Sequence, residues 1–324
     1  MGVALAVAFT VGMLVSPGVW SAVSARTTGA VNTSVKDAKC KVGIGPQDPA
    51  YDPVNHEIYV PNAGSSNISV VKAPCTKAGN IKLPASSSGT YPVAAAFDPA
   101  HDYVYVADAD ANAAYVINGT KIVTTLQGFD HPDALVYDPC AGSMMVANFG
   151  ADNLSGINEF DGVFGNIPTG MGPDGIDYDP LYVEELHVAN YYSGNVTTIY
   201  ACSLANFESV RVGSNPEGIA YDAEGRLDYV ADFGSDNVTD LFADSISGFD
   251  EPSSVTYAQA KLALYVTNYG SGQLWVLSTP PGSAPTVVEK ITVAKGIFGS
   301  AYDDADDDIY VTDSLTGILY DYSA

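Results

Sequence analysis

Residues 215–222 read NPEGIAYD, and residues 229–232 read YVAD. Both segments combine small, β-branched and aromatic residues, and both end on an aspartate. Apolar and aromatic residues of this kind favour strands, whereas Pro, Gly and Asp favour the turns between strands. The pair therefore predicts two short β-strands joined by a tight turn around Gly225.

The aromatic residue of the first segment recurs in seven copies, spaced 36 to 46 residues apart. The copies are anchored on Tyr51, Phe97, Tyr137, Tyr178, Tyr221, Tyr257 and Tyr302. A segment resembling YVAD follows each anchor by eight or nine residues, and further apolar stretches complete four short strands. A repeated four-stranded unit of about 40–45 residues is typical of a β-propeller. The dense turns and the absence of a 3.6-residue period exclude a helical solenoid.

The two ends of the repeat region predict how the ring closes. The seventh copy stops at Ala324, directly after its third strand, and a spare strand at residues 40–44 precedes the first copy. We therefore predict an all-β fold, a seven-bladed β-propeller with four-stranded blades whose last blade is closed by an N-terminal strand. This arrangement leaves no open sheet edge at the seam. The propeller is predicted at residues 38–324, after a polar leader at residues 26–37.

Three segments carry a resemblance to a known family: residues 215–222, residues 264–272 (LYVTNYGSG) and residues 188–197 (VANYYSGNVT). They resemble the YVTN family of β-propeller repeats, and the resemblance extends over all seven copies. It implies a seven-bladed propeller that is exported or on the cell surface, of the archaeal or bacterial type. It implies no single activity, because surface-layer and adhesin-like proteins carry such repeats, and related propellers include enzymes such as streptogramin lyases. The sixth and seventh copies depart most, at Ala258-Gln259 and at Ile297.

The four cysteines form no C-x-x-C pair and have no neighbouring histidine, which argues against a zinc site. Cys75 and Cys202 follow equivalent third strands in blades one and four, too far apart around a ring to be bridged. Cys40 lies next to blade one, whereas Cys140 and Cys202 fall in turns on one face of adjacent blades. We therefore predict the disulfides Cys40–Cys75 and Cys140–Cys202, with four free buried thiols as the alternative.

The composition limits the possible partners. Thirteen Lys and Arg residues against thirty-eight Asp and Glu residues give a net charge of −25 over 324 residues. A protein that binds nucleic acid or an anionic membrane needs a basic surface, so we expect neither partner. Apolar residues make up 47% of the chain, which is enough for a sizeable core and excludes wholesale disorder.

The N-terminus predicts export. An apolar run at residues 3–15 is too short to span a bilayer, which takes about 20 residues. The small residues at 21–25 suit cleavage after Ala25, so residues 1–25 are interpreted as a signal peptide, although no Lys or Arg precedes the run. The alternative is a retained N-terminal segment that anchors the protein or mediates assembly. We expect an extracellular or cell-surface location and no membrane span.

Six sequons permit glycosylation: Asn32, Asn67, Asn118, Asn153, Asn195 and Asn237. A second interpretation is structural, because Asn followed by Val and Thr also suits the change from a turn to a strand.

A binding face is predicted where loops lead into the innermost strands and where loops join the second and third strands. The candidates are Asp108, Asp130, His131, Phe149, Asp174, Tyr191, Glu217, Phe233, Asp250 and Tyr269. Such an acidic and aromatic rim around a central channel suits carbohydrates or peptides. The competing interpretation is that Asp residues serve turn geometry and that the aromatic residues cover the blade core.

Two acidic segments resemble calcium loops, which use carboxylate and amide oxygens as ligands. The first supplies Asp108, Asp110 and Asn112, but the EF-hand glycine and the final glutamate are missing. The second supplies Asp304, Asp306 and Asp308. Both segments also suit solvated turns. No cofactor is required by the sequence, and Ca²⁺ is the one ion that it suggests.

Catalytic signals are sparse. No nucleophile elbow, Walker or H-E-x-x-H motif is present. His131 lies on a loop that leads into an innermost strand, and with Asp130 and Asp133 it is the one candidate for acid–base chemistry. A solvated surface histidine explains the same residues.

We therefore interpret the chain as a secreted or cell-surface propeller that acts as a binding or assembly module, as in a surface layer, an adhesin or a filament. Its expected partners are other cell-surface proteins, itself or glycans. Two alternatives remain: an enzyme of the streptogramin-lyase or hydrolase type that uses the channel face, and a calcium-dependent carbohydrate or peptide binder.

Overall fold

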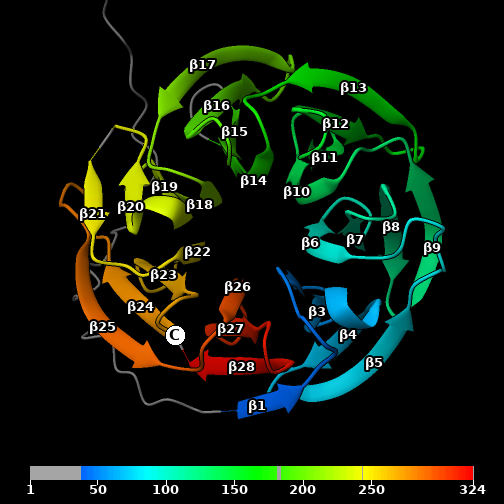
Figure 1. Cartoon of the computed structure of the whole chain (residues 1–324), viewed down its shortest axis with the longest axis horizontal. Coiled ribbons are helices and arrows are strands. Elements are labelled where there is room, and N and C mark those ends of the chain that lie inside the picture. Colours follow the sequence, from blue (N-terminus) through cyan, green and yellow to red (C-terminus); the bar gives the residue numbers. More distant parts are fainter. Residues whose placement is uncertain (1–37, 181–183, 243, 324) are drawn as a thin grey trace, which may run out of the picture. The chain divides into compact units, whose positions relative to one another are not determined.

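The computed structural model describes residues 38–180, 184–242 and 244–323. Within these ranges, seven four-stranded antiparallel sheets stand around a common axis as the blades of a β-propeller (Figure 1). The predicted fold class is therefore confirmed. The described helical elements are two short 3-10 turns, Ala63–Ser65 and Phe233–Ser235, and no described helix is long and apolar enough to cross a membrane.

Each blade runs from an innermost strand at the channel to an outermost strand at the rim. Blades 1 to 3 contain β2 (Ala50–Asp52), β3 (Glu57–Asn62), β4 (Asn67–Lys72) and β5 (Thr76–Lys82); β6 (Pro92–Asp98), β7 (Tyr103–Asp108), β8 (Ala113–Asn118) and β9 (Lys121–Gln127); and β10 (Pro132–Asp138), β11 (Ser143–Asn148), β12 (Asn153–Ile157) and β13 (Val163–Pro168). Blades 4 and 5 contain β14 (Pro173–Asp179), β15 (Glu185–Asn190), β16 (Asn195–Tyr200) and β17 (Ala205–Arg211); and β18 (Pro216–Asp222), β19 (Leu227–Asp232), β20 (Asn237–Asp240) and β21 (Ser245–Ser247). Blades 6 and 7 contain β22 (Pro252–Ala258), β23 (Ala263–Asn268), β24 (Gln273–Ser278) and β25 (Thr286–Thr292); and β26 (Ile297–Asp303), β27 (Asp308–Asp313), β28 (Ile318–Ser323) and β1 (Ala38–Lys41).

The seam closes as predicted, with β1 as the outermost strand of blade 7. It pairs antiparallel with β28, from Ala38 opposite Asp321 to Lys41 opposite Ile318. The strand begins two residues earlier than the predicted segment at 40–44 and ends at Lys41. Beyond it, the N–H of Val42 still donates to the carbonyl of Gly317. The edge of β28 that would otherwise be open at this seam is therefore covered by β1.

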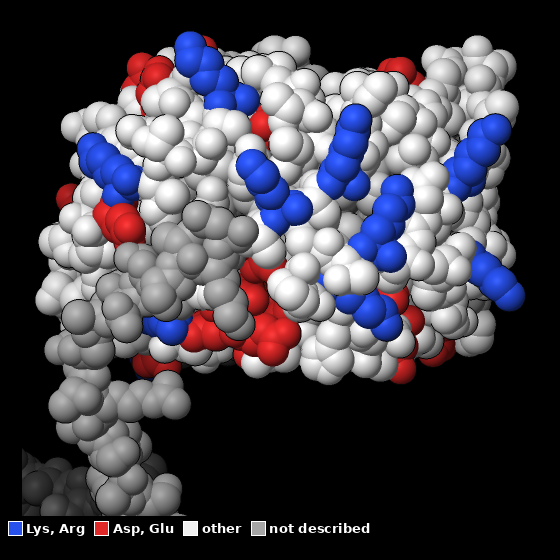
Figure 2. Space-filling model, turned by 90° about the horizontal axis from the view of Figure 1, so that it is seen from below, with Lys and Arg blue, Asp and Glu red and all other residues white. Residues whose placement is uncertain are grey.

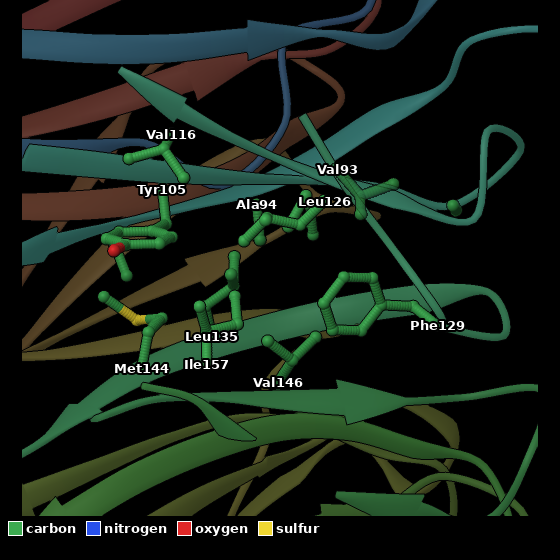
Figure 3. Close-up of a cluster of buried hydrophobic side chains, with 14 residues drawn as sticks. Val93, Ala94, Tyr105, Val116, Leu126, Phe129, Leu135, Met144, Val146 and Ile157 are labelled. Carbon is green, nitrogen blue, oxygen red and sulfur yellow. The ribbon is translucent and has the colours of Figure 1, made fainter. Parts of the chain in front are cut away.

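The hydrophobic core lies between neighbouring blades. Figure 3 shows one such layer, in which Tyr105 and Leu126 of blade 2 pack with Met144 and Val146 of blade 3. Val146 is fully buried and Met144 is nearly so. Burial of one such side chain contributes about 1.5–3 kcal/mol, so the repeated layers stabilise the ring as a whole.

Both predicted disulfides are present, and each joins neighbouring blades. Cys40 and Cys75 connect blade 7 to blade 1 with a Cα–Cα distance of 5.4 Å. Cys140 and Cys202 connect blade 3 to blade 4 with a Cα–Cα distance of 5.0 Å. The first bridge fastens the strand that closes the ring. Its removal would destabilise the closed ring, because the unfolded chain would lose a covalent constraint, although β1 would still pair with β28.

The antiparallel strand order gives the propeller two faces. We call the channel face the one that carries the loops leading into the innermost strands and the loops between second and third strands. The turn face is the opposite one, with the loops between first and second strands and between third and fourth strands. This division assigns the predicted binding residues to one side of the ring.

The outer wall of blades 6, 7 and 1 is basic, although the chain is strongly acidic. Figure 2 shows Lys and Arg side chains spread over this wall, while Asp and Glu lie mainly near its borders. Lys39 and Lys41 extend from β1, and Lys77 and Lys82 from β5; all four are exposed. Lysines on outermost strands hinder pairing with the edge of another sheet.

Four predicted sequon asparagines have a structural role. Each opens a third strand, and its side chain bonds to an Asn or Asp at the end of the preceding strand. The pairs are Asn62–Asn67, Asn148–Asn153, Asn190–Asn195 and Asp232–Asn237. These bonds explain why asparagine recurs at this place in the repeat. Asn118 is instead exposed at the end of β8, and Asn32 lies outside the described residues.

Candidate functional site

Backbone hydrogen bonds hold the loops of the channel face together. In all seven blades, the first residue after the second strand donates its N–H to a carbonyl of the loop that leads into the innermost strand. In four blades that first residue is aromatic. The bonds run from Phe149 to His131 (2.9 Å), Tyr191 to Gly172 (2.7 Å), Phe233 to Asn215 (3.0 Å) and Tyr269 to Glu251 (2.9 Å). The four predicted aromatic residues therefore occupy equivalent places around the channel.

A first aromatic group stands over blades 3 and 4. The ring of Phe149 lies 5.6 Å from His131 and 5.2 Å from Tyr192, measured between centroids. Tyr191 and Tyr192 meet edge to face at 5.2 Å. Gly172 permits this packing, because it has φ +65° and because a Cβ there would lie 2.7 Å from the Tyr192 ring.

A second aromatic group continues over blades 5 to 7. Phe233 lies 6.2 Å from Tyr269, and Tyr269 lies 6.4 Å from Phe298. Phe298 was missed by the sequence analysis, because the seventh copy has lost its proline and the loop alignment ends at Ile297. We call both groups together the aromatic rim: His131, Phe149, Tyr191, Tyr192, Phe233, Tyr269 and Phe298.

A cavity of about 190 Å³ opens at the centre of the ring, where the innermost strands meet. Three carboxylates from three blades line it: Asp48, Asp174 and Glu217. Apolar side chains such as Leu135 and Ile219 also line it, but most of the surface facing the cavity is polar. Hydroxyl groups complete the lining, namely Ser253, Ser254, Thr256 and Ser300.

The acidic groups come together because of a recurring irregularity in the innermost strands. In blades 3 and 4 the register shifts directly after the first proline, so that Asp133 and Asp174 occupy bulged positions. In blade 5 the shift extends over Glu217. β-bulges of this kind re-aim a side chain relative to the ladder. The sequence identified these residues as loop acids, but it gave no sign that Asp174 and Glu217 line one cavity.

Burial is the main cause of the raised pKa values in the acidic cluster, by which we mean Asp48, Asp133, Asp174 and Glu217. Burial, followed by the negative charge of Asp133, raises the pKa of Asp48 to about 7. Burial raises the pKa of Asp133 to about 6, although His131 acts in the opposite direction. Burial and then the neighbouring acids raise the pKa values of Asp174 and Glu217 well above their ordinary range. The cluster therefore holds protons near neutral pH when no cation is bound.

The acid–base candidates do not form a catalytic arrangement in the described residues. His131 is exposed, and its backbone N–H donates to Asn112 Oδ1 at 2.7 Å. No hydrogen bond or ion pair of the described residues involves its imidazole, which instead packs against Phe149. Asp130 is exposed, and only Asp133 belongs to the acidic cluster.

One predicted binding residue, Asp108, is buried, whereas Asp250 is exposed in the same way as Asp130. Asp108 is fully buried, and its carboxylate accepts from the N–H groups of Tyr91 and Ala111 and from the Tyr115 hydroxyl. It organises a turn and offers no surface to a ligand. Asp250 is exposed, and its N–H donates to Asn268 Oδ1 at 3.0 Å.

The predicted calcium loops show no ready set of ligands. In the first, Asp108 is already hydrogen-bonded, Asn112 accepts from the His131 N–H, and Asp110 is exposed. In the second, Asp304 and Asp306 are exposed on the turn face. Among the described residues, one group of three His, Cys, Asp or Glu ligand atoms lies within 4.8 Å: Cys140, Glu184 and Cys202. Its two sulfurs form a disulfide, so it is not a metal site.

No protein-family model and no curated protein matches this sequence. Solved structures do resemble the propeller. Virginiamycin B lyase from Staphylococcus aureus has a TM-score of 0.74 and 12% identity over 90% of this chain and 99% of that chain. A Kuenenia stuttgartiensis hydrazine synthase structure has a TM-score of 0.76 and 16% identity, covering 88% and 97%. A mitotic checkpoint complex structure has a TM-score of 0.76 and 12% identity, covering 91% and 96%.

At such low identity these likenesses show the fold alone. The similar structures differ widely in role, from a lyase to a synthase to a checkpoint complex. A shared propeller scaffold therefore does not select a function, which has to be argued from the site. The chain is a seven-bladed β-propeller with two disulfides and an aromatic, acidic channel face.

Proposed function

We propose that this protein is an extracellular, cell-surface binding module of the YVTN type, and that its docking surface is the channel face. The observation that carries this proposal is the aromatic rim beside a cavity lined by acids from three blades. Aromatic residues are enriched at the energetic centres of protein interfaces, and a rigid scaffold keeps their positions fixed. The expected partners are other surface proteins, a second copy or glycans.

The basic outer wall supports this choice of surface. Exposed lysines on β1 and β5 hinder the approach of another sheet edge. The rim offers instead large side chains with much of their area in water, such as Tyr192, which is 63% exposed. Removing such area from water is favourable, so the channel face has more to gain from a partner than the wall has.

The surroundings of His131 favour a binding function over a catalytic one. General acid–base chemistry needs a base within hydrogen-bond reach of an orienting group. The His131 imidazole makes an aromatic contact and no such bond among the described residues. The proposed export of the protein agrees with the two disulfides, which are typical of oxidising compartments. The predicted signal peptide at residues 1–25 and the polar leader at 26–37 lie outside the described residues.

Hydroxyl-radical footprinting tests the proposed face. The full-length protein is oxidised once after purification and once on its native cell surface, and the modified peptides are quantified by mass spectrometry. Tyr192 and Met171 report on the channel face, with exposures of 63% and 55%. Phe160 and Phe242, on turn-face loops, are the matched controls, with exposures of 83% and 77%.

We expect oxidation of Tyr192 and Met171 to fall severalfold on the cell surface while Phe160 and Phe242 remain reactive. Protection confined to the two phenylalanines would overturn the proposal in favour of the turn face. Protection of Val123 and Val288, which are exposed on outermost strands, would instead indicate contact through the blade rims.

A further inference from the structure

A groove of about 500 Å³ lies between blades 4 and 5 on the channel face. Its walls come from the loop between β15 and β16, the end of β17 and the turn after β19. Most of its surface is polar, and among the described residues no Asp or Glu lines it. The chain has thirty-eight acidic residues against thirteen basic ones, so this groove is a local exception on an acidic molecule.

Arg211 brings a positive charge into the groove. It is the last residue of β17 and stands opposite Asn195. Its side chain is exposed, and no ion pair among the described residues involves it. A guanidinium presents five N–H donors in a fixed fork and binds a carboxylate through two parallel bonds. The unpaired charge therefore favours an anionic ligand from outside the chain.

Two serine hydroxyls add further donors to the lining. Ser193 Oγ accepts the N–H of Met171 at 2.6 Å, and Ser235 Oγ accepts the N–H of Ser214 at 2.8 Å. Among the described residues, neither hydroxyl proton has an acceptor. A hydroxyl that already accepts one bond can still donate its own proton. The groove therefore offers donors to a ligand that supplies oxygen acceptors.

The carboxylate behind the groove wall does not compete for Arg211. Asp232 is fully buried, and it accepts from the N–H of Gly213 and from the side chains of Asn237 and Thr239. These bonds fix the turn that forms one wall of the groove. The carboxylate is thus already hydrogen-bonded within the protein, and the guanidinium remains available at the surface.

The seam between blades 7 and 1 shows that the fold does not require this lining. The same pair of loop hydrogen bonds recurs there, and Lys41 takes the place of Arg211 opposite the first residue of a third strand. Two exposed apolar residues, Ile44 and Leu315, stand where the groove has a serine and a tyrosine. Turn geometry alone therefore does not explain the donors between blades 4 and 5.

Size and polarity favour a saccharide as the ligand. Pockets for small molecules have volumes of about 300–1,000 Å³, and this groove lies within that range. Its exposed serine and arginine donors match the ring and hydroxyl oxygens of a sugar. Tyr192, which is 63% exposed at one wall, adds an amphipathic ring. An acidic peptide would find little apolar surface here for its other side chains.

We infer that this groove binds the carboxylate of an acidic saccharide, and that Arg211 pairs with that carboxylate. The inference rests on the proposed function, which includes glycans among the partners, and it names the class of glycan. Ser193 and Ser235 would donate to neighbouring oxygens of the same ligand. Because Tyr192 belongs to both the groove and the aromatic rim, the bound saccharide would lie at the edge of the proposed docking surface.

The test uses the purified full-length protein and two probes of nearly equal shape. Methyl glucuronide carries the carboxylate, and methyl glucuronamide is its neutral counterpart. Saturation-transfer NMR at neutral pH and constant ionic strength measures the affinity of each probe. The titration is repeated with a methyl sialoside, and with acetate and an acidic dipeptide as competitors. Circular dichroism and the thermal midpoint confirm that every variant is folded.

Arg211→Gln removes the charge of the groove, and Lys41→Gln is the matched control at the seam. We expect Arg211→Gln to weaken binding of the glucuronide about tenfold, which equals about 1.4 kcal/mol, while Lys41→Gln leaves it unchanged. Arg211→Lys keeps the charge but loses the fork, so its affinity should lie in between. The glucuronamide should show no specific binding. Should Arg211→Gln fail to fold, a shift of the Arg211 Nε–H signal on addition of glucuronide carries the same prediction.

Equal binding of the two probes, or binding that survives Arg211→Gln, would overturn the inference. Displacement of the glucuronide by equimolar acetate would overturn it in favour of an unselective anion site, and displacement by the dipeptide in favour of a protein ligand. Absence of binding by both the glucuronide and the sialoside would overturn it too. None of these results bears on footprinting of Tyr192 and Met171 at the native cell surface, which tests the channel face whatever ligand it binds.

Discussion

Two regions of the propeller bury acidic groups, and they treat the charge in opposite ways. Between blades 4 and 5, His187 lies next to Asp228, with 2.8 Å between Nδ1 and Oδ2, and both residues are buried. In the channel cavity, Asp174 and Glu217 line the wall with no cation from the described residues. The first region contains its own counter-charge, whereas the second lacks one. A paired site of this kind keeps its charge, whereas the unpaired acids respond with raised pKa values.

The interface between blades 4 and 5 is a group of close polar contacts, in which the 2.8 Å approach of His187 to Asp228 is an ion pair without the geometry of a hydrogen bond. His187 Nε2 lies 3.5 Å from Glu185, and Asp177 accepts the Tyr221 N–H at 2.6 Å across the blade boundary. Burial lowers the pKa of His187, but the contacts with Asp228 and Glu185 outweigh it and raise the pKa to about 10. The imidazolium is therefore the stable form at neutral pH, and it fastens the two blades together.

Replacing the histidine should produce the largest effect. His187→Ala leaves Asp228 buried without its counter-ion, and loss of one member of a buried pair costs about 3–5 kcal/mol. We expect the free energy of unfolding to fall by this amount in guanidinium denaturation, with an unchanged slope. His131→Ala is the control. A loss below about 1 kcal/mol would show that the network does not hold the blades, because ordinary surface changes have effects of that size or smaller.

The second largest effect is expected in the pH dependence of stability, which differs between the two regions. Because the pKa of His187 is raised from 6.5 to about 10, its contribution is fully present below about pH 6.5 and is lost as the pH rises to 10. We therefore expect stability to decline over this alkaline window, and the decline to be smaller in His187→Ala. Urea denaturation at a series of pH values measures it. Identical slopes in both proteins between pH 7 and 10 would refute the assignment.

The cavity should respond in a lower pH window. The pKa of Asp48 is raised from 3.8 to about 7, so the folded state binds more protons than the unfolded state between these values. Stability is therefore lost as the pH rises from about 4 to about 7. Asp48→Asn removes this contribution to the pH dependence. At pH 8 we expect the substitution to stabilise the protein by about 1 kcal/mol, since it removes an unpaired charge from the cavity.

Two results would contradict this account of Asp48. One is a destabilised Asp48→Asn protein at pH 8, which would show that the carboxylate has a partner. The other is an unchanged slope between pH 4 and 7. Asp177 also has a pKa raised to about 7 and titrates in the same window, so its contribution remains in the variant as an internal reference.

The sequence predicted the fold from features that are local and repeated. The spacing of aromatic anchors and turn residues predicted the blades, and the spare N-terminal strand predicted the seam and the pair Cys40–Cys75. These predictions succeed because each repeat forms its own sheet. The loop aromatics were also predicted, because a residue just after the second strand of a blade must lie on the channel face.

The cavity and the interface between blades 4 and 5 could not be predicted from the sequence in the same way. Asp108 and Asp174 both looked like acidic residues of the binding face, but one caps a turn and the other lines the channel. The difference comes from their places in the repeat, because Asp108 ends the second strand of its blade, whereas Asp174 lies at a bulge of an innermost strand. His187 and Asp228 lie in different copies of the repeat, and their contact depends on how neighbouring blades are rotated. A contact between two repeats leaves no recognisable pattern in the sequence of either repeat.

The smallest effect is expected at His131, which belongs to neither network. His131→Ala should change the free energy of unfolding by less than about 0.5 kcal/mol, because the side chain is exposed and its backbone bond to Asn112 remains. It should raise the pKa of Asp133 slightly above about 6, because the imidazolium lowers that pKa. Carbon-detected NMR titration of the carboxyl group measures the shift. A large loss of stability, or an unchanged pKa of Asp133, would mean that His131 is placed differently and that the boundary between the aromatic rim and the acidic cluster lies elsewhere.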